Sequence, residues 1–197
     1  MSPLLVSVLI EEHDTIIEEI IITKRNLHIN LKADGMITSL NDIVLGVLTA
    51  DCAPIFIYDN NKKIVCCLHS GWRGTLDNIS NNAVLLIDKY NIKRNNLNAI
   101  IGPCLGTNNY EVDEKFRKKF VSKNSNYLKF FRKKNSSKFL FNLRGIINFQ
   151  LKELGIKNIH NINRDTYFNK KLFFSHRRST HSTVKVTGRL INLISLT

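Results

Sequence analysis

TADCAPIFIYDNNKKIVCCLHSGWRGT, residues 49–75, is the stretch that decides the expected fold. It holds three of the four cysteines, the only tryptophan and one of the six histidines of a 197-residue chain. Two runs rich in β-branched residues, 54–58 and 63–68, flank the segment DNNKK, and Asp and Asn are typical turn residues. The stretch therefore predicts a β-hairpin.

The hairpin brings two candidate metal ligands together. Cys52 lies just before the first strand, and His69 follows directly on the second. Counted back from the turn, both lie toward the open end of the hairpin, where a thiolate and an imidazole can meet. The residues alone leave a third ligand open among His13, His28, His160, His176, His181 and Cys104.

Length and composition favour a single domain. A chain of 197 residues with 43% hydrophobic content can bury a full core, and no repeat or linker divides it. No apolar run approaches the ~18–20 residues of a membrane span, and the start lacks the features of a signal peptide. We therefore expect a cytoplasmic protein that does not cross a membrane, with reduced cysteines that serve as ligands or nucleophiles.

Basic residues give a formal net charge of +13 and concentrate in residues 115–138, which contain ten Lys or Arg and no acid. Such runs are typical of solvated helix faces, and Phe116, Phe120, Phe130 and Phe131 fit the inner faces of short helices. The alternative is a surface for nucleic acid, in which the same aromatic rings stack on bases.

The pattern along the chain predicts a mixed α+β fold. Further strand-like runs lie at 4–10, 16–22, 43–49, 97–101 and 184–194. Helical spacing of apolar residues predicts helices at 75–90, 113–121 and 143–154, the last with Asn142 as N-cap and Gly155 at its end. Strict strand–helix alternation is absent, which favours layers over a doubly wound sheet.

Five motifs follow one another in the order of a known family: TADCAPI (49–55), HSGWRG (69–74), GPCLGTNNYEV (102–112), DTY…FFSHRR (165–178) and TGR (187–189). From about residue 10 to its end, the chain resembles the laccase-domain family, also called YfiH-type or polyphenol-oxidase-like. The resemblance implies a layered α/β/β/α sandwich with mixed sheets, in one domain over residues 1–197. The family has a longer segment ahead of its first ligand, so we expect this start to lack a strand and some substrate contacts.

The resemblance also implies an activity and a ligand set. The family comprises purine nucleoside phosphorylases with adenosine deaminase activity, so a purine nucleoside and phosphate are the expected partners. Its metal ligands fall on His13, Cys52 and His69, although EEHD stands here in place of the family's Gln-x-His. Cys52, His69 and Arg73 are the expected catalytic residues.

Zinc is the expected metal. Two imidazoles and one thiolate leave a fourth position open for water or substrate, and zinc lowers the pKa of bound water toward ~7. A blue-copper centre usually has an axial Met, and neither Met1 nor Met36 is obviously placed for that role. The copper centres of a multicopper laccase need roughly ten histidines, whereas this chain has six, so the oxidase label is disfavoured.

The residues around the two ligands have competing interpretations. Arg73, in the turn before the helix at 75–90, can cradle an anion or pair with a carboxylate such as Asp51. Trp72 can stack on a purine or pack in the fold. Arg177 and Arg178 can add positive potential to a cleft or hold the C-terminal strands. Cys104 is a reserve ligand, and Cys66 and Cys67 are expected to pack on opposite sides of a strand.

Two rival functions remain open. Cys52 with His69 as base would make a cysteine hydrolase, and the name peptidoglycan editing factor, used for bacterial relatives, points to a cell-wall precursor as substrate. A non-enzymatic relative would bind nucleic acid through residues 115–138. The sequence does not reveal the oligomeric state.

Overall fold

The computed structural model describes residues 5–9, 20–21, 33–41, 43–61, 63–183, 185 and 187–196. Within these residues the strands are β1 (Leu5–Leu9), β2 (Ile20–Ile21), β3 (Gly35–Thr38), β4 (Ile43–Thr49), β5 (Ala53–Asp59), β6 (Val65–Ser70), β7 (Leu97–Ile101), β8 (Glu111–Asp113), β9 (Phe131–Lys133), β10 (Lys138–Phe141), β11 (Asn158–Asn161) and β12 (Leu190–Ser195). The helices are α1 (Trp72–Leu76), α2 (Ile79–Asp88), α3 (Glu114–Lys123), α4 (Leu143–Glu153) and α5 (His176–Thr180), with 3-10 turns η1 (Arg94–Asn96), η2 (Thr107–Asn109) and η3 (Ser125–Phe130).

The predicted hairpin forms the centre of a six-stranded sheet in the order β11-β7-β5-β6-β3-β2. Strands β5 and β6 are antiparallel, and their register places Pro54 opposite His69 and Ala53 opposite Ser70. Strands β7 and β11 run parallel at one edge, as do β3 and β2 at the other, so the sheet is mixed.

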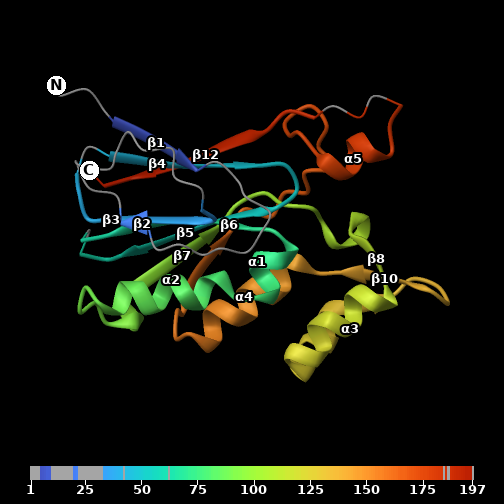
Figure 1. Ribbon diagram of the computed structural model, residues 1–197, viewed down its shortest axis with the longest axis horizontal. Helices are drawn as coiled ribbons and strands as arrows, with labels where there is room; N and C mark the ends of the chain where they lie inside the picture. The colour runs from blue at the N-terminus through green and yellow to red at the C-terminus, as the bar shows by residue number, and fades with distance from the viewer. Residues whose placement is uncertain are drawn as a thin grey trace.

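The six-stranded sheet lies between two different layers. Helices α2 and α4 cover one face, and the sheet β1-β4-β12 covers the other (Figure 1). Side chains of β5 alternate accordingly: Ile55 and Ile57 join the helix-side core, and Phe56 joins the core between the sheets. A fully buried side chain of this kind stabilises the fold by about 1.5–3 kcal/mol relative to an exposed one. The mixed, layered α+β class is confirmed.

The helix expected at 75–90 is two helices. Asn78 adopts a left-handed conformation with φ 56° and ψ 58°, which ends α1 and starts α2. Its side-chain oxygen accepts a hydrogen bond from the backbone N–H of Asn81 at 3.3 Å. The prediction of one helix was wrong because apolar spacing does not register an asparagine that breaks the backbone and caps the next helix.

Helix α4 agrees closely with its prediction. The Asn142 side chain accepts a hydrogen bond from Gly145 N at 2.8 Å, as an N-cap does, and Gly155 follows the helix with φ 87°. In contrast, β3 and the short strands β8 to β11 were not expected, and only residues 20–21 of the predicted strand 16–22 are described.

The basic stretch 115–138 folds over an aromatic cluster. Phe116, Phe120 and Phe131 pack with Phe141 of β10, with ring centroids 4.9–6.3 Å apart, and Phe120 is fully buried. Phe116 and Phe120 lie on the inner face of α3, as expected, and Phe130 ends the 3-10 turn η3 and packs on Phe149. Phe131 also packs inward, but it begins strand β9, so its placement on a helix was wrong. The lysines of α3 stand on the outside, while the cluster anchors α3 and the small sheet β8-β10-β9 to the main body.

No helix in the described ranges is both long and apolar enough to cross a membrane.

Candidate functional site

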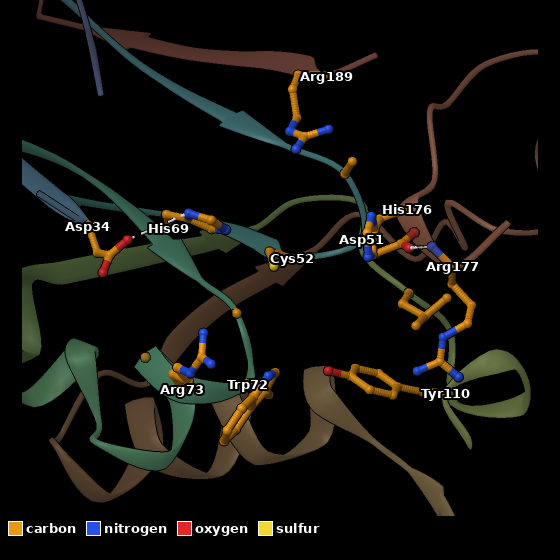
Figure 2. A pocket seen from close by; sticks show the side chains of 14 residues that line it. Asp34, Asp51, Cys52, His69, Trp72, Arg73, Tyr110, His176, Arg177 and Arg189 are labelled. Atoms are coloured by element: carbon orange, nitrogen blue, oxygen red, sulfur yellow. Dashed lines mark hydrogen bonds and ion pairs between the residues drawn. The ribbon is translucent and has the colours of Figure 1, made fainter. Parts of the chain in front are cut away.

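A cavity of about 360 Å³ opens at the end of the β5–β6 hairpin, where the sequence predicted a site. Its lining includes Cys52, His69, Trp72, Arg73, Tyr110 and Arg177. Figure 2 shows the imidazole of His69 between Asp34 and Cys52, with Trp72 and Arg73 along one side and Tyr110 and Arg177 along another. Three of the expected site residues, Cys52, His69 and Arg73, therefore line one cavity.

Strand pairing positions the thiol and the imidazole. Cys52 directly precedes β5, whose Ala53 pairs with Ser70 of β6, so the two donors stand at the same end of the hairpin. Cys52 is half-buried, and a Cβ at Gly71 would lie only 2.9 Å from its sulfur. A side chain at residue 71 would therefore displace this thiol, and glycine leaves room for it beside the turn into α1.

His69 is held from behind by Asp34. The imidazole is 5% exposed, and its Nδ1 lies 3.7 Å from Oδ1 of Asp34. The backbone N–H of His69 donates to the carbonyl of Asp34 at 2.7 Å, which fixes the two segments against each other. A carboxylate behind one ring nitrogen favours the imidazole that presents its other nitrogen to the cavity, as in many metal-binding histidines.

The donor set fits zinc in type. A half-buried thiol and a buried imidazole that share a cavity are ligands that zinc prefers, and the cavity leaves room for a further ligand. Among the residues with described positions, no group of three His, Cys, Asp or Glu is arranged to hold a metal ion. The third expected ligand, His13, lies outside the described residues, as does His28, so the full ligand set stays a prediction.

The side of the cavity that faces the hairpin is held in place by hydrogen bonds to one buried carboxylate, that of Asp51. Asp51 accepts hydrogen bonds from Thr166 Oγ1 at 2.6 Å, from Ser175 Oγ at 3.0 Å and from the backbone N–H of Arg177 at 2.6 Å. Ser175 is also the N-cap of α5. This network holds the start of α5, with His176 and Arg177, against the loop that contains Cys52.

Positive charge faces the cavity from several directions. Arg73 and Arg189 are exposed at its rim, and Arg177 is half-buried with its guanidinium 5.4 Å from the ring centroid of Tyr110. The Asp51 carboxylate is occupied by the network above, so the alternative pairing of Arg73 with Asp51 is not the one observed. The rim therefore suits an anion.

Two aromatic residues complete the lining. Trp72 packs on Phe116 at 5.4 Å between ring centroids, while Arg73 and Lys119 approach its ring to 4.9 Å and 5.2 Å. Burial raises the pKa of the Tyr110 hydroxyl well above its ordinary value, so this group stays protonated and can donate a hydrogen bond. An anion, a flat ring and a hydrogen-bond acceptor can thus be bound within one cavity.

Several candidates from the sequence lie elsewhere. Cys104 is buried, its sulfur lies 3.2 Å from Arg144 Nη2, and burial raises its thiol pKa to about 11. Cys66 and Cys67 pack on opposite faces of β6, as expected. Arg178 donates to the carbonyls of Thr166, Tyr167 and Phe173 and so holds the C-terminal segment together. Among the remaining histidines, His160 is exposed on β11, and His181 contacts Tyr167.

Sequence reasoning did not single out Asp34, Tyr110 or Arg189, although each lines the cavity. Tyr110 and Arg189 lie inside the motifs GPCLGTNNYEV and TGR, and Asp34 lies in ADGMIT. The order of those motifs was the available signal, because nothing in local periodicity indicates that the three segments meet.

The sequence pattern of a family described as multi-copper polyphenol oxidoreductase laccase matches residues 6–197. A purine nucleoside phosphorylase of Rickettsia prowazekii is 39% identical over 166 residues, which cover 83% of this chain and 68% of that protein. One from Rickettsia conorii is 39% identical over 151 residues, covering 76% and 62%, and one from Campylobacter jejuni is 32% identical over 184 residues, covering 90% and 73%. The chain thus spans less than two thirds of the R. conorii protein.

Solved structures resemble the whole fold. A crystal structure of a Neisseria meningitidis protein superposes with a TM-score of 0.87 at 25% identity, over 98% of this chain and 75% of that one. The hypothetical protein YfiH of Bacillus licheniformis superposes with a TM-score of 0.85, also at 25% identity and with the same coverage.

Proposed function

The chain belongs to the multi-copper polyphenol oxidoreductase laccase family, and from that membership we propose that it is a purine nucleoside phosphorylase. The proposed reaction cleaves the bond between purine and ribose with inorganic phosphate, and adenosine is also deaminated in the same cavity. Three similar relatives are named as purine nucleoside phosphorylases, which supports the class of substrate.

One observation carries the proposal: a thiol, an imidazole, an arginine rim and a tryptophan share a single cavity. At about 360 Å³, the cavity is in the size range of small-molecule sites. Among the described residues, two histidines, His69 and His176, line this cavity, and an oxidase with several copper centres would need many more. The family description therefore does not decide the chemistry.

The chain's own residues have distinct roles in the proposed reaction. Arg73 and Arg177 bind the phosphate, because guanidinium groups pair with phosphate oxygens through two parallel hydrogen bonds. Trp72, whose ring Arg73 and Lys119 already approach, is the proposed aromatic contact of the purine, and the protonated hydroxyl of Tyr110 donates a hydrogen bond to a base nitrogen or a ribose oxygen. Held in this way, phosphate and the anomeric carbon are oriented for reaction, which lowers the entropic part of the barrier.

Zinc is the proposed metal, with copper a less suitable alternative, and Cys52, His69 and His13 are its proposed ligands. When bound there, zinc supplies a Lewis acid and a water whose pKa is lowered toward ~7. Asp34 behind His69 orients the imidazole toward the cavity.

The test is an assay of the full chain with inosine plus phosphate and with adenosine, together with metal analysis of protein purified without added metal. We expect release of free base, about one zinc per chain, and loss of both in Cys52→Ala with at least a ~100-fold fall in rate. Cys66→Ala, which removes a buried thiol away from the cavity, should keep its zinc and its activity. The proposal would be refuted if the purified protein contained no metal and its release of free base did not depend on phosphate.

A cysteine hydrolase is the second candidate, because Cys52 alone among the four cysteines is half-buried and shares its cavity with a histidine. In that case Cys52 is the nucleophile and His69 its base, with a cell-wall precursor as substrate. Metal-free protein whose Cys52 is rapidly alkylated by iodoacetamide, and which hydrolyses such a precursor, would favour this candidate.

A further inference from the structure

A second cavity, of about 520 Å³, lies beside helix α4 and is distinct from the first. Of the described residues that line the two cavities, they share only Leu105, because the loop after β7 separates them. None of the described residues that line the second cavity has a role in the proposed reaction. Its lining is dominated by Arg144, Asn148, Lys152, Asn161, Arg164 and Asp165.

The topology places this cavity where parallel sheets commonly bind ligands. Strands β7 and β11 are parallel, and their last residues, Ile101 and Asn161, pair with each other. The chain leaves both strands at that end, through Gly102 and through Ile162, and the first turn of α4 contacts the same point. A crevice outside the carboxyl ends of parallel strands is a frequent ligand site in such sheets.

Helix α4 presents one polar face to the cavity. Arg144, Asn148 and Lys152 are spaced four residues apart, so they lie along one side of the helix. Arg144 Nη1 donates to the carbonyls of Ile101 and Gly102 at 3.2 Å and 3.0 Å, which fixes α4 to the strand end. Asn148 and Asn161 exchange two side-chain hydrogen bonds of 2.9 Å and 3.0 Å, so this part of the lining is already rigid.

The charge of the cavity favours an anion. Lys152 and Arg164 are exposed, and the structure pairs neither with a carboxylate of the described residues. Asp165, the one carboxylate among the described lining residues, is engaged by the N–H groups of Gly106 and Tyr167 and by the Asn109 amide. Within the described part of the chain, no carboxylate balances these two cations at the rim.

The other lining residues indicate which kind of chemical group accompanies the anion in the ligand. Leu105 is the only apolar side chain among the described residues that line the cavity, and no aromatic ring is among them. Asn142, Asn148, Asn161 and Asn163 contribute amides instead, and the oxygens of Asn142, Asn148 and Asn161, which each accept one hydrogen bond within the fold, keep a second lone pair for a ligand. Amides suit hydroxyl groups, which donate and accept at once, whereas a purine would find no face to stack on. The ligand of this cavity therefore carries hydroxyls in preference to a flat base.

From the strand ends, the unpaired cations and the amide lining, we propose that the second cavity binds a phosphorylated sugar. Lys152 and Arg164 hold the phosphate, and the asparagines receive the sugar hydroxyls. This site stands independently of the proposed phosphorylase activity, since its residues do not take part in it. If both hold, a product class of the first cavity, a pentose phosphate, is recognised at the second.

The test uses the full chain, with ribose 5-phosphate as probe and amide shifts in two-dimensional NMR as readout. We expect shifts at residues 143–148 and 161–165, and at least a ~10-fold loss of affinity in the double variant Lys152→Gln/Arg164→Gln. The double variant Lys115→Gln/Lys157→Gln removes the same charge from exposed positions outside both cavities and should bind as the parent does. Equal thermal midpoints of the two double variants establish that folding is unchanged.

Two further probes, ribose and inorganic phosphate, test the sugar and the phosphate of the proposed ligand separately. Ribose alone should bind weakly because it lacks the phosphate, and inorganic phosphate alone should bind weakly because it lacks the hydroxyls. Inorganic phosphate as tight as ribose 5-phosphate would overturn the assignment of a sugar. Shifts confined to the first cavity, no shifts at all, or unchanged affinity in Lys152→Gln/Arg164→Gln would overturn the site. None of these results depends on whether the first cavity catalyses phosphorolysis.

Discussion

On the hairpin side of the first cavity, Cys52 and His69 are placed by strand pairing, whereas the facing side depends on hydrogen bonds between distant segments. The backbone N–H of Arg177 reaches the carboxylate of Asp51 across 126 residues of sequence. The hairpin side has backbone pairing along six residue pairs of β5 and β6, and it is buried in the main core. The C-terminal side has few buried apolar contacts, and Phe168, Leu172 and Phe174 are largely exposed.

The difference shows two ways to position a functional group. Register fixes a side chain through many weak contacts, so no single substitution displaces it. A buried carboxylate fixes a segment through a few strong bonds, so its loss releases every partner at once. The two walls should therefore respond differently to the same kind of perturbation, and this contrast can be measured.

Asp51→Ala should have the largest effect. It leaves three donors without an acceptor, at a cost of about 1–3 kcal/mol each, and puts Ala at φ 86°, where asparagine and aspartate are better tolerated, so we expect a loss of about 3–5 kcal/mol in the free energy of unfolding. Denaturant unfolding measures this loss. Asp51→Asn also loses the charge but still tolerates the left-handed backbone. The difference between Asp51→Asn and Asp51→Ala therefore separates the effect of the backbone conformation from that of the lost charge.

The matched control is Asp113→Ala, which removes the N-cap of α3, where Oδ1 accepts from Phe116 N at 2.7 Å on the surface. It should cost only about 1 kcal/mol. Equal losses in Asp51→Ala and Asp113→Ala would mean that the C-terminal wall does not depend on the buried carboxylate.

The free energy of unfolding should fall at alkaline pH because of the buried thiols on the hairpin side of the cavity. Burial raises the pKa of Cys66 from 9.0 to about 12, and it also raises the pKa of the adjacent Cys67. Between pH 9.0 and about 12 the folded chain keeps the Cys66 proton that the unfolded chain loses, so the folded state binds more protons and stability falls as pH rises. The expected slope is about 1.4 kcal/mol per pH unit for each such thiol.

Urea unfolding from neutral pH to about pH 10 measures this slope. Cys66→Ala removes one of the titrating thiols, so its slope should be shallower than the parent's, while lysine deprotonation affects both chains alike. Parallel slopes in the two proteins would show that the buried thiol does not contribute.

Arg177→Gln tests the cationic part of the C-terminal wall. Its side chain lines the cavity and its guanidinium also donates one hydrogen bond to the carbonyl of Glu111, so we expect the KM for phosphate to rise about ten-fold, equal to about 1.4 kcal/mol, with a modest fall in the thermal midpoint. Arg178→Gln is the matched control, because that side chain holds three backbone carbonyls and does not line the cavity. It should lower the thermal midpoint more and the phosphate affinity less.

The hairpin wall was predictable from the sequence, and the C-terminal wall was not. Turn chemistry, strand runs and the positions of Cys52 and His69 suffice to place those two residues at one end of a hairpin. The bounds of helix α4 were equally predictable from the sequence because Asn142 and Gly155 mark its ends. In each case the signal lies within about a dozen neighbouring residues.

The contacts of Asp51 with Thr166 and Ser175 span more than a hundred residues, and no local pattern encodes them. The same holds for Asp34 behind His69, which reaches the site through the pairing of β3 with β6. Short strands such as β8 and β9, of three residues each, carry too little periodicity to predict, and their existence depends on tertiary pairing with β10.

Lys119→Gln should have the smallest effect and addresses the contact between α3 and Trp72, the first residue of α1. Lys119 Nζ lies 5.2 Å from the ring centroid of Trp72, an exposed cation–π contact that is worth about 0.5 kcal/mol. Because Trp72 is the only tryptophan, its fluorescence reports on the cavity directly, and quenching by an added purine nucleoside measures affinity. Lys119→Gln should change that affinity about two-fold, whereas Lys118→Gln, one residue along the same helix, removes an equal charge and should leave it unchanged. An equal response to both substitutions would assign the effect to the general positive field of α3, and the contact with Trp72 would then have no separate role.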